Sequence, residues 1–74
     1  MSTRQKSING YRIEPFANLQ GAQLQRARLG GMNLYCVNLR NADLSGARMY
    51  GVDLKTAKFC KTIMPDLRVN DQDC

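Results

Sequence analysis

Residues 17–66 read, in blocks of five, ANLQG AQLQR ARLGG MNLYC VNLRN ADLSG ARMYG VDLKT AKFCK TIMPD. The third position of every block holds only Leu, Met or Phe, and these residues are Leu19, Leu24, Leu29, Leu34, Leu39, Leu44, Met49, Leu54, Phe59 and Met64. The first position is small or apolar in nine blocks and threonine in the last, and the other three positions are mostly polar or glycine. The sequence is therefore an internal repeat with a period of five residues.

A period of five fits neither of the common regular structures. A helix needs apolar residues about every 3.6 positions, and in a flat strand an odd period would send successive leucines to opposite faces. The conflict disappears if the chain turns a corner once per block, so that the first and third positions both point inward. The last position of each block would then be the corner, where glycine is favoured, and it is occupied by Gly21, Gly31, Gly46, Gly51, Arg26, Cys36, Asn41, Thr56, Lys61 or Asp66.

Three blocks carry a resemblance to a known family. Ala17-Asn18-Leu19, Ala42-Asp43-Leu44 and Val52-Asp53-Leu54 resemble the A(D/N)LXX motif of pentapeptide-repeat proteins. The resemblance implies an all-β fold, a right-handed, four-sided β-helix with four blocks in each coil. Residues 17–66 would then form about two and a half coils, and residues twenty apart would stack, such as Leu19, Leu39 and Phe59.

A chain of 74 residues allows one small domain, which we divide into three segments. Residues 1–16 are expected to form a polar arm and cap, residues 17–66 the repeat, and residues 67–74 a second cap. Exposed coil ends need covering. Ile8, Tyr11, Ile13 and Phe16 surround an Asn9-Gly10 turn signal and fit a strand or loop over the first coil, and Leu67 and Val69 could close the other end. A homodimer through an open coil end is the alternative.

The three cysteines are an odd number, so at least one thiol stays free or pairs between chains. Residues 60–66 resemble the T-x-MPDG ending of many cyanobacterial members of the family, with Leu67 where glycine is usual. Similar tails carry cysteines at the places of Cys60 and Cys74, so the resemblance implies a disulfide that pins the tail, worth about 3 kcal/mol. The alternative is two reduced thiols. Cys36 is expected to be an ordinary small residue at a corner.

Composition removes several classes of site. The chain has no histidine, which excludes the usual general base and the commonest zinc ligand, and it has no CxxC spacing. Asp43 and Asp53 would lie on opposite walls, so they suggest no acid–base pair, and Asp66, Asp71 and Asp73 lack a calcium-binding loop pattern. We therefore predict no catalytic, cofactor or metal site. The polar, basic start is no secretory signal and no apolar run could span a membrane, which favours a cytoplasmic protein.

The leading functional prediction is a non-enzymatic structural or protein-interaction module, without a cofactor and with an unidentified protein partner. The net charge of +5 supports an alternative, a nucleic-acid-associated protein that uses a basic surface of Arg26, Arg28 and Arg48 beside Tyr50. The favoured interpretation of the same arginines is a solvated wall that also prevents edge-to-edge aggregation. Arg40, Lys58 and Lys61 would gather on another side. Some family members bind DNA gyrase as mimics of duplex DNA, a role that the short length and positive charge disfavour here.

Overall fold

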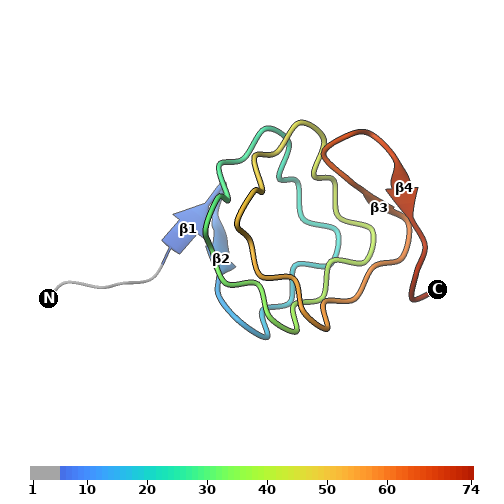
Figure 1. Ribbon diagram of the computed structural model, residues 1–74, viewed down its shortest axis with the longest axis horizontal. Helices are drawn as coiled ribbons and strands as arrows, with labels where there is room; N and C mark the ends of the chain where they lie inside the picture. Colours follow the sequence, from blue (N-terminus) through green and yellow to red (C-terminus); the bar gives the residue numbers. More distant parts are fainter. Residues whose placement is uncertain (1–5) are drawn as a thin grey trace, which may run out of the picture.

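The repeat forms stacked coils in the computed structural model, which describes residues 6–74 (Figure 1). Turns recur every five residues along the repeat. Isolated parallel bridges join residues twenty apart, and they are Asn18↔Asn38, Gln23↔Asp43, Arg28↔Arg48, Asn33↔Asp53, Asn38↔Lys58 and Asp43↔Ile63. A turn every five residues and a stacking interval of twenty give four turns in each coil.

Hydrogen bonds between neighbouring coils follow one pattern throughout. The Leu29 N–H donates to the Arg48 carbonyl at 2.8 Å, and the Arg48 N–H donates to the Ala27 carbonyl at 2.8 Å. Each side of a coil makes only one such bridge before the chain turns, which is too short to count as a strand. The four strands of the structure therefore lie in the segments before and after the repeat, or in its last block. They are β1 Lys6–Ile8, β2 Tyr11–Ile13, β3 Thr62–Ile63 and β4 Val69–Asn70. The described residues are all-β and form no helix, so no helix there is long and apolar enough to cross a membrane.

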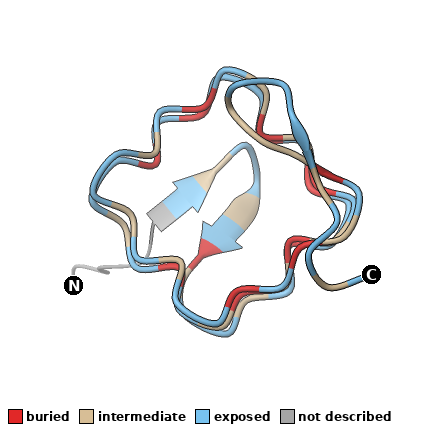
Figure 2. Cartoon of the chain, turned by 45° about the vertical axis from the view of Figure 1, so that its right-hand side comes forward, coloured by how far each residue is buried: buried red, intermediate tan, exposed pale blue. Residues whose placement is uncertain are grey.

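The interior is built from the first and third positions of the blocks, which recur as buried segments where the coils superimpose (Figure 2). Seven of the ten third-position residues are buried: Leu19, Leu24, Leu29, Leu34, Leu39, Leu44 and Phe59. Met49, Leu54 and Met64 are only partly buried, because they belong to the last coil and no further coil lies over them. Phe59 belongs to the same coil, but the tail lies beside it and bonds to its backbone through Asp73. Thr62 is fully buried, and its hydroxyl donates to the Leu39 carbonyl at 2.6 Å.

Asn and Asp at the second position of a block have a local structural role. The Oδ1 atom of Asn38 accepts the Arg40 N–H at 3.1 Å, and Asp53 Oδ1 accepts the Lys55 N–H at 3.0 Å. The same cap forms at Asn18, Asn33 and Asp43. At Asp43 the side-chain hydrogen bond from the Ser45 hydroxyl, followed by the bond from the Ser45 backbone, lowers the pKa of the carboxyl. These side chains satisfy a backbone donor where each turn begins.

Positive φ angles mark the corners. Gly21 and Gly51 have φ of 73° and 75°, and Arg26 and Thr56 adopt 60° and 58° at equivalent places, so glycine is used but not required. The last block departs from the predicted frame. Asp66 is not left-handed, whereas Leu67 has φ of 71°, because the chain there leaves the coil to form the β3–β4 hairpin.

The first coil is covered by a hairpin. Strands β1 and β2 pair antiparallel around Asn9-Gly10, and the hairpin lies across the opening of the coils in Figure 2. The Tyr11 hydroxyl accepts the Gln23 N–H at 3.1 Å, and Ile13 is buried. Phe16 was expected to join this cap, and that prediction was wrong. Its side chain is 70% exposed and packs edge-to-face on Tyr35, with ring centroids 5.7 Å apart, because it stands at a corner with positive φ and points outward.

The tail covers one side of the last coil. Strand β4 pairs antiparallel with β3, the Asp73 N–H donates to the Phe59 carbonyl at 2.7 Å, and Asp71 accepts the Lys61 N–H at 2.9 Å. Leu67 and Val69 do not close the coil end as expected, because they are 69% and 58% exposed. Hydrogen bonds of the tail backbone and its aspartates, together with a disulfide between Cys60 and Cys74, hold it in place, and apolar packing contributes little.

Candidate functional site

Two arginines stack on one outer wall of the repeat. Arg28 and Arg48 are bridge partners on neighbouring coils, and both side chains are exposed. They line a shallow hollow together with Gly30, Met32 and Tyr50. We call this feature the Arg28–Arg48 hollow. The structure thus brings together three of the four residues that the sequence proposed as a basic surface, and it adds Gly30 and Met32.

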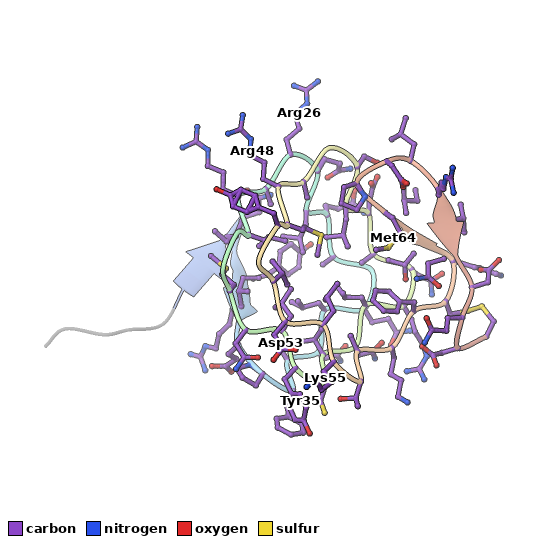
Figure 3. All side chains as sticks on the ribbon, viewed as in Figure 1. Arg26, Tyr35, Arg48, Asp53, Lys55 and Met64 are labelled. Atoms are coloured by element: carbon purple, nitrogen blue, oxygen red, sulfur yellow. A yellow bond between two sulfur atoms is a disulfide. The ribbon has the colours of Figure 1, made fainter. Side chains whose placement is uncertain are left out.

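Arg26 occupies a neighbouring hollow instead. It lines a depression with Gln25, Ser45, Gly46 and Leu67. Its Cγ atom lies 3.4 Å from the point that a Cβ on Gly46 would occupy, so the arginine stem packs over that glycine. In Figure 3 the Arg26 and Arg48 side chains extend from the same side of the molecule, so Arg26 adds charge beside the Arg28–Arg48 hollow without lining it.

The guanidinium groups of this surface lack carboxylate partners. Within residues 6–74 the ion pairs are Arg12 with Glu14 at 3.9 Å and Arg68 with Asp66 at 3.6 Å. Neither involves Arg26, Arg28 or Arg48. The Arg28–Arg48 pair therefore places two like-charged side chains on backbones that lie one strand spacing apart, about 4.8 Å along the stack.

Tyr50 forms one side of the hollow and is 84% exposed. A Cβ added to Gly30 would lie 3.5 Å from the Tyr50 carbonyl oxygen and 4.0 Å from two atoms of its ring. Glycine at position 30 therefore leaves the ring room to lie against the wall, and much of the ring remains open to solvent.

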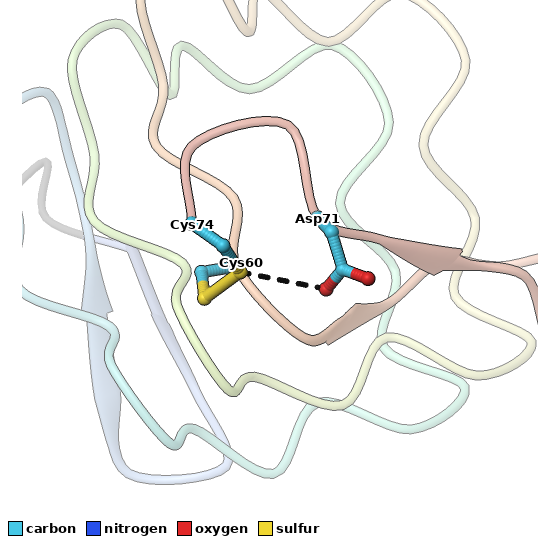
Figure 4. Close-up of side chains that lie close together, drawn as sticks. All are labelled: Cys60, Asp71 and Cys74. Carbon is cyan, nitrogen blue, oxygen red and sulfur yellow. Dashed lines mark hydrogen bonds between the residues drawn. A yellow bond between two sulfur atoms is a disulfide. The ribbon is translucent and has the colours of Figure 1, made fainter.

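The cysteines that the family tail suggested are joined in the structure. Cys60 and Cys74 form a disulfide, with Asp71 beside it (Figure 4). These three residues also lie close enough together to resemble a metal-ligand set. Disulfide sulfurs are not thiolates, and Asp71 already accepts a backbone N–H, so the group anchors the tail rather than offering a metal site. Cys36 lies at its corner, with its sulfur 2.7 Å from the Thr56 hydroxyl.

The other part of the last coil, residues 47–56, is left uncovered by the tail. Met49, Val52 and Leu54 are partly exposed there. Within the described chain, the N–H groups of Met49 and Leu54 and the carbonyls of Ala47 and Val52 have no backbone partner. We call residues 47–56 the open coil edge. It combines apolar side chains with free strand-edge donors and acceptors.

Comparison with known families decides what the repeat is. The family model for pentapeptide repeats matches residues 17–55, in 8 copies. The chain belongs to the pentapeptide-repeat family. The sequence-based assignment is therefore confirmed. Neither the curated proteins nor the solved structures that were compared with the chain gave a match.

The pentapeptide-repeat motif also reveals what sequence reasoning missed at the Arg28–Arg48 hollow. Arginine stands at both second positions, where the motif has Asn or Asp. Arginine has no side-chain oxygen with which to cap the N–H two residues on. Among residues 6–74 the Gly30 and Tyr50 N–H groups accordingly have no hydrogen-bond acceptor. The sequence did contain the signal for these free donors, namely arginine at a position where the repeat motif has Asn or Asp.

Proposed function

We propose that this pentapeptide-repeat protein is a non-enzymatic interaction module built on a right-handed, four-sided β-helix. Stacking at an interval of twenty residues and the turns every five support that architecture. Repeat columns expose regular walls and ends, and such surfaces bind other macromolecules. The absence of histidine from the sequence, which removes the commonest general base, supports the non-enzymatic part of the proposal.

The observation that carries this proposal is the open coil edge. A strand edge with both donors and acceptors free can pair with a second copy of itself across a two-fold axis. Met49, Val52 and Leu54 would lose water in that contact, which favours association through the hydrophobic effect. A homodimer formed through this edge is the concrete form of the proposal.

Leu54→Glu is expected to weaken self-association about tenfold or more, because it places a charge in the apolar contact. Dimerisation should strengthen as salt is added, because each copy carries a net charge of +5 and salt screens their repulsion. Sedimentation equilibrium over a range of protein and salt concentrations measures both effects.

Leu67→Glu is the matched control, since Leu67 is 69% exposed outside the open coil edge. Thermal unfolding of each variant shows whether the coil itself is intact. A protein that remains monomeric at every soluble concentration, or a Leu54→Glu variant that dimerises as well as the control, would exclude this mode of association.

Association with nucleic acid is the second candidate function, and the unpaired arginines of the Arg28–Arg48 hollow favour it. Their guanidinium groups lack carboxylates within 4.0 Å in the described chain, so they are available to phosphates. The two candidates respond to salt in opposite directions. Phosphate binding weakens as salt rises, whereas pairing of two cationic copies strengthens.

A further inference from the structure

The Arg28–Arg48 hollow has the charge of an anion site. The inter-coil hydrogen bonds of 2.8 Å fix the backbones of the two arginines side by side, so their side chains rise from the same wall. Two like charges on neighbouring side chains repel each other, and no carboxylate within residues 6–74 lies within 4.0 Å of either guanidinium group. A bound anion would relieve this repulsion and accept hydrogen bonds from both planar guanidinium groups.

Two backbone donors supplement the arginines. In capped blocks the Asn or Asp oxygen receives the N–H two residues on, as Asn38 does for Arg40 and Asp53 for Lys55. In the blocks of Arg28 and Arg48 the equivalent donors are the Gly30 and Tyr50 N–H groups, which the described chain leaves free. By equivalence with the capped blocks, we expect these donors to face the place that an amide or carboxylate oxygen occupies at Asn38 and Asp53. An oxygen of a bound anion fits that space, because backbone N–H groups in such concavities bind anions.

The tyrosine indicates what kind of anion would be bound. The Tyr50 ring lies against Gly30 and is largely exposed, and Met32 adds an apolar surface in the same hollow. A carboxylate or free inorganic phosphate would leave both unused. A nucleotide supplies a phosphate and a planar base together, and an unpaired base can stack on an aromatic ring.

We propose that the Arg28–Arg48 hollow binds a nucleotide unit of single-stranded nucleic acid. The phosphate lies between the two guanidinium groups and the free Gly30 and Tyr50 N–H groups, and the base stacks on the Tyr50 ring. This inference rests on the second candidate function and narrows it. It predicts that single-stranded nucleic acid binds more tightly than duplex, because bases within a duplex are stacked on each other and leave no face for Tyr50.

The test measures binding of a fluorescent oligothymidylate, and of a duplex of equal length, to the full chain over a series of salt concentrations. The wild type is expected to favour the single strand. Tyr50→Leu should weaken single-strand binding about 5- to 100-fold and leave the salt slope unchanged, because it removes stacking but no charge. Arg28→Ala with Arg48→Ala should weaken binding and flatten the slope.

Two matched variants distinguish binding at the Arg28–Arg48 hollow from non-specific attraction to the protein's net positive charge. Arg40→Ala with Lys58→Ala removes the same charge from the wall of Asn18 and Asn38, and it should affect binding much less. Arg28→Asn with Arg48→Asn removes the same charge but adds oxygens that cap the free N–H groups. It should therefore bind more weakly than the double alanine variant, although its turns are at least as stable.

The possible results distinguish the inference from the function on which it rests. If no nucleic acid binds at low salt, both the second candidate function and this site are wrong. If single strand and duplex bind equally, and the Arg28/Arg48 variants behave like the Arg40/Lys58 control, association with nucleic acid stands and the proposed site is overturned.

Discussion

Leu39→Ala is expected to lower the free energy of unfolding by about 2–5 kcal/mol. Leu39 is fully buried, and it stacks between Leu19 and Phe59 in the middle coil. Removing its side-chain carbons leaves a cavity, and the hydrogen bonds to the coils on both sides prevent the backbone from closing it. A domain of this size is stabilised by only about 4–11 kcal/mol in total, so the variant is expected to be partly unfolded at moderate temperature.

Leu67→Ala is the control for this prediction, since it deletes the same atoms from a side chain that is 69% exposed. It should change stability by no more than about 0.5 kcal/mol. Urea denaturation followed by circular dichroism measures both variants. Equal midpoints for the two would mean that the inward row is not the core.

Cys74→Ser is expected to lower the free energy of unfolding by about 3 kcal/mol, the value for a disulfide that closes a short loop. The bond joins Cys60 on the last coil to the tail, across a sequence separation of 14 residues. Without it the tail is held by its backbone ladder and by Asp71 and Asp73 alone. Hydrogen exchange at the Phe59 and Lys61 amides should then accelerate more than exchange in the first coil.

Cys36→Ser removes the cysteine that is not in the disulfide, and it should leave stability nearly unchanged. A dithiol reductant should lower the stability of the wild type and of this control alike, and should have little effect on Cys74→Ser. A wild type that is indifferent to reductant would show that the bond does not form in solution.

The sequence was most informative about the core, where the third residue of each block points inward. Leu19 through Leu44 are buried because each lies beneath another coil, and the period of five residues was enough to predict that. Met49, Leu54 and Met64 satisfy the same pattern but are partly exposed, since burial depends on what lies above a residue. A periodic pattern does not encode where a stack of coils ends.

The flanking segments were harder to predict because their apolar residues have no period. Ile13 is buried, whereas Phe16, Leu67 and Val69 are exposed although they are equally apolar. Phe16 and Leu67 both adopt positive φ, so backbone geometry decided their direction. The basic surface was predicted from the stacking interval, but the free Gly30 and Tyr50 donors were not, because they follow from a cap that is missing.

The stacking interval of twenty residues also constrains how insertions and deletions can change this protein. Gain or loss of a whole coil of twenty residues would leave each remaining residue on the same wall as before. Loss of a single block, such as residues 37–41, would leave the inward row filled but move Asp53 opposite Arg28. The arginine pair would become an ion pair, and the interior would remain intact. Single-block changes can therefore replace the surface of such a protein in one genetic event, whereas whole-coil changes alter only its length.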